Sequence, residues 1–211
     1  MSLCLWSVDG TLLHKFELDD PMVHILGCVI LPGTQNVATF DNQKQVYVHD
    51  LESKMLVRGS SSEVDLSSMC VSRLGKPYAL LLRKDGLIEM VDVRTMEMVK
   101  VFKLKSYGHF IIRATFGGEN EEFVASGSEG KLGLRPSGSR GSELTLATDG
   151  DIYLWETASG RLLTKRKAHT PPASCNSIAW NPKRHGMVAS AGDDHAVRMS
   201  ENLSLTLSPR R

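Results

Sequence analysis

The chain has 211 residues, of which 41% are hydrophobic, and its 25 Lys and Arg residues nearly balance 24 Asp and Glu residues, for a net charge of +1. These values are typical of a globular protein with one sizeable core, and they argue against a nucleic acid as partner, because binding a polyanion favours concentrated basic charge. No apolar run approaches the roughly 18 residues of a membrane span, and the amino terminus lacks a secretion signal, so we expect no membrane contact and a cytoplasmic or nuclear protein.

From its start the chain repeats one pattern, a short strand of alternating apolar residues that ends in an aromatic or apolar residue. The repeats are Leu3–Trp6, Val46–His49, Leu87–Val91, Ile152–Trp155 and Ala196–Met199. Their equivalent end positions, 6, 49, 91, 155 and 200, are separated by 43, 42, 64 and 45 residues. Because a period of about 40 to 45 residues is typical of four-stranded propeller blades, the sequence predicts an all-β protein built from successive blades.

Each complete repeat begins with another predicted strand and a turn. The first strands are predicted at 24–31, 66–72, 111–116 and 175–180, and turn-forming residues such as Pro, Gly and Asn follow most of them. We therefore predict a partial propeller over 1–200, with a blade fragment at 1–20, blades at 21–60, 61–104, 105–167 and 168–200, and an irregular tail at 201–211.

The 64-residue interval contains a segment that breaks the period, residues 130–148. Its 19 residues are rich in Gly, Ser and Arg, with little alternation beyond Leu144-Thr-Leu146. We expect a disordered surface insertion in the turn between the second and third strands of its blade. The segment is either a genuine insertion or translated intron sequence, since Gly130-Lys131 can be encoded by a sequence that resembles a splice donor.

Two blades carry residues that resemble the WD-repeat family. They include Ala168-His169, SIAWNP at 177–182 and VASAGDD at 188–194, with ASGS at 125–128 and DGDIYLW at 149–155 in the blade before. In that family a His before the first strand, a Ser or Thr in the second, an Asp in the next turn and a Trp in the third hydrogen-bond to one another. The resemblance implies these structural roles for His169, Ser190 and Asp194 in the last blade, and for Ser126, Asp149 and Trp155 in the one before.

Other positions depart from the family pattern. His49 and Val91 stand at the Trp position of the earlier blades, Gln43 replaces one turn Asp, and Ser200 occupies the Trp position of the last blade, whereas Asp85 keeps its turn. The resemblance implies a ring of about seven blades, of which this chain supplies about four. We therefore expect an incomplete WD-repeat β-propeller.

A more specific resemblance covers residues 108–198, with looser agreement over 1–107. The stretch FIIRATFGGENEEFVASGSE at 110–129, followed by DGDIYLW, SIAWNP and ASAGDDHAVR, is similar to the WD-repeat subunits of GID/CTLH ubiquitin ligases. The resemblance implies a non-catalytic scaffold or substrate-recruiting subunit in proteasome-dependent degradation, with ligase subunits and substrates as protein partners. A generic WD-repeat adaptor, in a cullin-type ligase or a signalling complex, is the alternative.

Features that suggest catalysis have simpler structural explanations. Asp193-Asp194-His195 could bind a metal or act as an acid–base pair, but a turn between strands accounts for it, and Ser128 lacks the glycine of a nucleophile elbow. The four cysteines are far apart and form no C-x-x-C pair, which argues against a zinc site or a disulfide framework. We expect no catalytic residue, cofactor, metal or small-molecule substrate; an enzyme on a propeller fold is the remaining alternative.

An acidic run follows Phe116-Gly117-Gly118 in a predicted hairpin turn. We expect Glu119, Glu121 and Glu122 to form a solvated loop, and they are our candidates for contact with a protein partner because peptides dock on propeller rims. The two glycines are expected to serve turn geometry.

Overall fold

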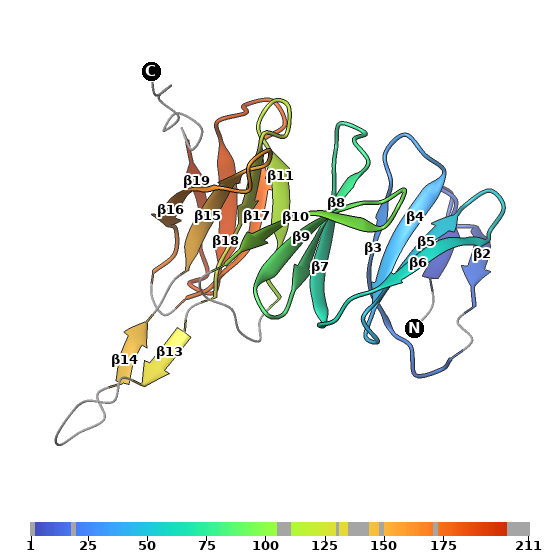
Figure 1. The fold of residues 1–211 in the computed structure, drawn as a ribbon, viewed down its shortest axis with the longest axis horizontal. Coiled ribbons are helices and arrows are strands. Elements are labelled where there is room, and N and C mark those ends of the chain that lie inside the picture. The colour runs from blue at the N-terminus through green and yellow to red at the C-terminus, as the bar shows by residue number, and fades with distance from the viewer. Residues whose placement is uncertain are drawn as a thin grey trace.

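Figure 1 shows the computed structural model, in which small β-sheets stand side by side along the molecule. The structure describes residues 3–17, 20–104, 111–129, 131–134, 144–147, 150–170 and 173–201, with the backbone alone described at 131–134 and 144–147. Every regular element in these ranges is a strand, from β1 to β19, which confirms the all-β prediction. No helix within these ranges is long and apolar enough to cross a membrane.

The amino-terminal part of the structure consists of a hairpin and the first complete blade. Strand β1 (Leu3–Trp6) pairs with β2 (Leu12–Phe16) in a two-stranded sheet. The first blade is a four-stranded antiparallel sheet of β3 (Ile25–Ile30), β4 (Asn36–Asp41), β5 (Gln45–Asp50) and β6 (Leu56–Ser61). Its strands follow chain order from one edge to the other, as in a propeller blade.

Two further four-stranded blades and a three-stranded sheet follow. The second blade consists of β7 (Leu66–Val71), β8 (Tyr78–Arg83), β9 (Leu87–Asp92) and β10 (Glu97–Lys103). The third blade consists of β11 (Ala114–Gly117), β12 (Phe123–Ser126), β15 (Asp151–Glu156) and β16 (Leu162–Lys167). The fourth, three-stranded blade consists of β17 (Cys175–Trp180), β18 (Val188–Gly192) and β19 (Val197–Ser200).

The blades share their irregularities as well as their strand order. The pairing of the last two strands shifts register between Leu5 and Trp6, between Val48 and His49, and between Leu154 and Trp155, each time at the position predicted for the Trp. The second blade shifts nearby, between Met98 and Lys100 of β10. A bulge that recurs at equivalent positions indicates repeated units, because bulges are specific features of a strand pair. It also identifies β1 and β2 as counterparts of the last two strands of a blade.

The hydrophobic core lies between the blades. The first strands of successive blades contact one another, β3 with β7, β7 with β11, and β11 with β17. One buried cluster joins the second blade to the third through Phe102, Leu104, Tyr153 and Trp155, among others. A second joins the third blade to the fourth through residues such as Phe123, Ile152 and Trp180. Each blade therefore buries its faces against its neighbours, as stacked repeats do.

The segment 130–148 lies between the second and third strands of its blade, as its position in the sequence predicts, but the expectation of disorder is wrong for part of it. Strand β13 (Lys131–Leu134) pairs with β14 (Leu144–Ala147) in a separate two-stranded sheet, which projects from the third blade in Figure 1. Leucine alternates with other residues in both strands, a period-two pattern that the Gly, Ser and Arg content of the segment obscures in the sequence. The rest of 130–148 lies outside the described residues, as does the tail after 201.

Candidate functional site

The structure brings His169, Ser190 and Asp194 together in the fourth blade. The His169 side chain is completely buried; its Nδ1 lies 2.7 Å from Asp194 Oδ1 and its Nε2 lies 3.0 Å from Ser190 Oγ. Because an ionised carboxylate can only accept, Nδ1–H donates to Asp194, and the Ser190 hydroxyl is hydrogen-bonded to the other ring nitrogen, Nε2. The imidazole thus joins the loop before β17 to strand β18 and to the turn that follows it.

Asp194 receives further hydrogen bonds that hold it in its charged form. The backbone N–H of Thr170 donates to Oδ2 at 3.0 Å, and Arg198 Nη2 lies 2.7 Å from the same oxygen. These bonds, first that from Thr170 and then those from His169 and Arg198, hold the pKa of Asp194 well below its ordinary value. The carboxylate therefore acts as the centre of a turn and is fully engaged by groups of its own blade.

A glycine makes room for this network. A Cβ atom at Gly192 would lie 2.6 Å from the Cγ of His169 and 2.5 Å from the carbonyl oxygen of Ser174. Both distances are shorter than real contacts of a Cβ atom, so a side chain at residue 192 would displace the imidazole or the backbone. Glycine is thus required at residue 192 because the backbone there lies close to the His169 ring and to the Ser174 carbonyl oxygen.

The third blade places its predicted residues differently. Ser126 is completely buried and donates its hydroxyl to the carbonyl of Gly127 at 3.1 Å. Trp155 is buried and stacks on Tyr153, with ring centroids 5.7 Å apart and planes inclined by 19°. Asp149 lies outside the described residues.

Ser128, which sequence reasoning treated only as a rejected nucleophile, has a structural role. Its hydroxyl accepts a hydrogen bond from the backbone N–H of Asp151 at 3.0 Å, and its carbonyl accepts one from the N–H of Cys175 at 2.9 Å. The first bond ties the segment after β12 to the start of β15, and the second ties the third blade to the fourth. Its position two residues after Ser126, on the same face of an extended chain, was the available signal.

The first blade also connects the loop before its first strand to the turn after its second strand, as the His169–Asp194 bond does in the fourth blade, but with different residues. Gln43 stands four residues after Thr39, as Asp194 does after Ser190. The Nε2 of Gln43 donates to Asp20 Oδ2 at 3.1 Å, so donor and acceptor are exchanged between the loop and the turn. Both residues are exposed, and this contact is correspondingly weaker than the buried one in the fourth blade.

Glu121 corrects the prediction of a solvated acidic loop. It is only 6% exposed, and it holds a left-handed φ of 57° in the turn between β11 and β12. Its carboxylate accepts hydrogen bonds from the Ser72 hydroxyl at 2.6 Å and from the backbone N–H of Arg73 at 2.6 Å. Because the turn directs Glu121 toward the second blade, its carboxylate joins two blades and is not free for a partner.

The other two glutamates of this run remain on the surface. Glu119 and Glu122 are exposed, and Glu122 Oε2 accepts a hydrogen bond from the backbone N–H of Asn120 at 2.8 Å. Their contact with a partner stays a prediction.

The two glycines of the Phe116-Gly117-Gly118 stretch are required for different reasons, a turn and the packing of the next blade. Gly118 has a φ of +89°, as the turn prediction requires. Gly117 lies in β11 and has another reason: a Cβ atom there would stand 2.0 Å from the indole ring of Trp180. Sequence reasoning missed this contact because Trp180 comes from a different blade, more than 60 residues later in the chain.

The turn after β18 places the three residues that suggested catalysis, Asp193, Asp194 and His195, in different surroundings. Asp193 Oδ1 accepts a hydrogen bond from Asn176 Nδ2 at 2.5 Å, Asp194 turns toward His169, and His195 is exposed with a left-handed φ of 58°. Across the part of the chain that the structure describes, no three His, Cys, Asp or Glu side chains are arranged to hold a metal ion.

Three four-stranded antiparallel blades and a three-stranded one, stacked face to face, with a His–Asp–Ser network in the three-stranded blade, define a WD-repeat protein. Comparison with known proteins agrees, although no protein-family model matches the chain. It is similar to GID complex subunit 7 of Schizosaccharomyces pombe, with 27% identity over 98% of this chain and 36% of that protein. The chain is thus a WD-repeat protein, homologous over most of its length to this subunit and to WD repeat-containing protein 26 homologues.

Two further relatives show the same extent of similarity. The WD repeat-containing protein WDS homolog of Arabidopsis thaliana is 25% identical over 93% of this chain and 33% of its own length. The WD repeat-containing protein 26 homolog of Drosophila melanogaster is 25% identical over 93% of this chain and 27% of its own length. The chain therefore spans about a third of the length of the curated relatives it matches.

Proposed function

We propose that this chain is a non-catalytic interaction scaffold or substrate-recruiting subunit of a GID/CTLH-type ubiquitin ligase, acting in proteasome-dependent degradation. The observation that carries the proposal is the similarity to GID complex subunit 7 over 98% of the chain. Its partners would be ligase subunits and substrates, and its location the cytoplasm or nucleus, where such a ligase acts.

The arrangement of the polar residues supports a scaffold. His169, Ser190 and Asp194 engage one another inside the fourth blade, and Glu121 joins the second blade to the third. Side chains that satisfy each other in this way stabilise the fold, and proteins of the WD-repeat family are usually non-catalytic. Stacked blades would hold their surface turns in fixed positions for recognition of partner proteins.

The test is affinity purification of the tagged chain from cells, with ligase subunits quantified by mass spectrometry. Recovery of RING-bearing GID/CTLH subunits, well above an unrelated WD-repeat protein expressed equally, is the expected result. If the wild-type chain is soluble and recovers none of them, the proposed role is wrong.

Two variants locate the surface that is used. Deletion of residues 130–148 removes the projecting hairpin, and Glu119→Lys with Glu122→Lys reverses the exposed charge of the acidic turn. A loss of ligase subunits with the charge reversal alone would assign binding to the turn, and a loss with the deletion alone would assign it to 130–148. The matched control is Glu52→Lys, a charge reversal on the first blade.

A further inference from the structure

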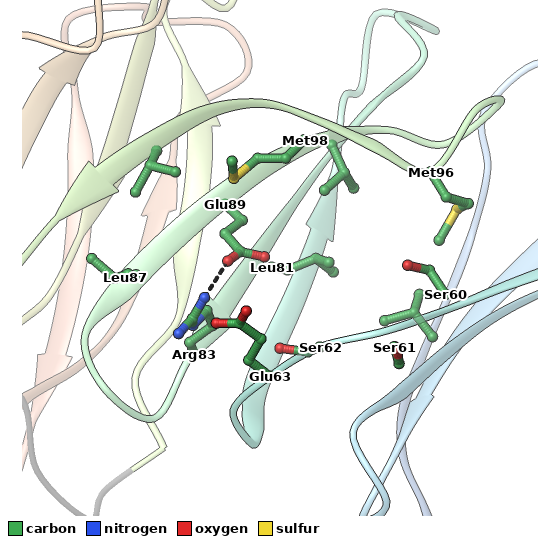
Figure 2. A pocket seen from close by; sticks show the side chains of 13 residues that line it. Ser60, Ser61, Ser62, Glu63, Leu81, Arg83, Leu87, Glu89, Met96 and Met98 are labelled. Atoms are coloured by element: carbon green, nitrogen blue, oxygen red, sulfur yellow. Dashed lines mark hydrogen bonds and ion pairs between the residues drawn. The ribbon is translucent and has the colours of Figure 1, made fainter.

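A pocket of about 400 Å³ lies between the first and second blades (Figure 2). The second blade contributes its third strand, with Leu87, Glu89 and Val91, together with Leu81, Arg83 and the methionines at 96 and 98. The first blade contributes Val46 and the Ser60–Ser62 stretch. The volume lies within the range of about 300 to 1,000 Å³ that is typical of ligand pockets.

The equivalent space is filled in the third blade. There Tyr153 and Trp155 are almost completely buried and stack against each other. Strand pairing sets the equivalence: Tyr153 pairs with Ser126 as Glu89 pairs with Leu81, and Trp155 lies two residues further along, as Val91 does. The second blade therefore has a carboxylate and a small side chain where the third has two aromatic rings.

The first blade follows the third in this respect. Tyr47 pairs with Thr39, the counterpart of Ser126, and its ring lies 6.1 Å from that of His49 at the Trp position. Two blades thus have an aromatic pair at these positions, and the second blade lacks it.

The wall of the pocket that the first blade contributes also lacks large side chains. Phe102, paired with Ile88, and Leu104 contact the aromatic pair of the third blade within one buried cluster. Their counterparts one blade earlier are Ser60, paired with Val46, and Ser62. Large residues are therefore replaced by small or polar ones on both sides of one junction, and this explains the cavity.

Charged groups line the floor of the pocket. Arg83, whose side chain is 11% exposed, lies 2.5 Å from Glu89 and 2.6 Å from Asp85, and Figure 2 shows the Arg83–Glu89 pair facing Glu63 and the serines. Two carboxylates, Glu63 and Glu89, line the pocket with a single guanidinium that Asp85 also engages, so the pocket favours a hydrogen-bond donor and disfavours an anion.

We propose that this pocket receives a tyrosine side chain from a peptide segment of a partner protein. The ring would occupy the space that Tyr153 and Trp155 fill in the third blade, between the leucine and methionine side chains. The phenolic hydroxyl would donate to a carboxylate of the floor, and phosphorylation of the tyrosine would prevent binding, since the phosphate would meet that carboxylate.

The test is methyl NMR on the full chain with ¹³C-labelled methionine methyl groups, titrated with N-acetyl-tyrosinamide. Met98, assigned by Met98→Leu, should shift saturably, whereas the exposed Met22 and Met55 should not. N-acetyl-leucinamide and the O-phosphorylated tyrosine derivative should give several-fold smaller shifts. Equal shifts with the leucine derivative, or none at Met98, would overturn the proposal.

Filled variants provide the matched control. Glu89→Tyr with Val91→Trp reproduces the third blade, and Ser60→Phe alone reproduces the other wall and leaves the Arg83–Glu89 pair intact. Each should abolish the Met98 shift while circular dichroism shows an unchanged fold. If the shift persists in a folded filled variant, the probe binds elsewhere and the proposal is wrong. This experiment needs no ligase, so its result is independent of the proposed function.

Discussion

Gly117 lies directly against the indole of Trp180, so that a Cβ atom at residue 117 would stand 2.0 Å from the ring carbon Cε3. The ring cannot easily move away: it stacks on Phe123 with centroids 5.9 Å apart, and its Nε1–H donates to the carbonyl of His185 at 2.7 Å. We predict that Gly117→Ala lowers the free energy of unfolding by about 2–3 kcal/mol, because overpacking forces a well-packed junction to shift. Urea denaturation measures the change.

Gly59→Ala is the matched control for this substitution. A Cβ atom at Gly59 would lie 3.2 Å from a ring carbon of Tyr47, a contact that a small movement relieves. We expect a loss below about 1 kcal/mol. Equal losses for the two alanines would show that the Trp180 junction is not tightly packed.

Replacing His169 should destabilise the fourth blade. We predict a loss of about 2–4 kcal/mol for His169→Ala, because the change opens a cavity and leaves the buried Ser190 hydroxyl without its partner. Thermal unfolding followed by circular dichroism gives the measurement. The exposed His24 is the control, and a His24→Ala variant as unstable as His169→Ala would contradict the assignment.

The network also predicts a dependence of stability on acid. The pKa of Asp194 is lowered in the folded chain from its ordinary value of 3.8, first by the Thr170 N–H and then by His169 and Arg198. A lowered pKa contributes stability that is present above 3.8 and is lost as the pH falls through the lower, folded value. Asp194→Asn should therefore be less stable than wild type at neutral pH, with the difference shrinking below pH 3.8. A difference that stays constant down to strong acid would exclude this contribution.

Cysteine reactivity should follow burial. Desolvation, followed by the charges of Asp151 and Asp194, raises the pKa of the Cys175 thiol to about 12, whereas Cys28 is exposed. We expect iodoacetamide to modify Cys28 readily in the native chain and Cys175 only after unfolding in urea. Peptide mass spectrometry of a time course distinguishes the two sites, and equal native rates would mean that the third and fourth blades do not close over Cys175.

The sequence predicted the features that depend on local pattern. The repeat spacing located the first and third strands of the blades, because alternation and turn residues act over a few positions. The His169 network followed from the family resemblance, and its members lie within one blade.

Contacts between blades were beyond local pattern. An acidic run is normally solvated, and nothing near Glu121 in the sequence indicates that Ser72, in another blade, donates a hydrogen bond to its carboxylate. The same holds for Gly117 and Trp180, and for the pocket, which arises from substitutions on two blades at once. At residues 131–134 and 144–147 the local pattern was present, but the composition of the segment, rich in Gly, Ser and Arg, predicted disorder. The two alternating stretches pair as strands.

Side chains that cross the junctions join successive blades. A double-mutant cycle of Ser72 and Glu121 tests this joining most directly. The Ser72 hydroxyl is fully buried and donates to the Glu121 carboxylate at 2.6 Å. Ser72→Ala and Glu121→Ala, singly and together, should give a coupling free energy of at least about 1 kcal/mol in urea denaturation, whereas Ser72 and the exposed Glu122 should be additive. Additive losses for Ser72 and Glu121 would contradict a polar connection between the second and third blades.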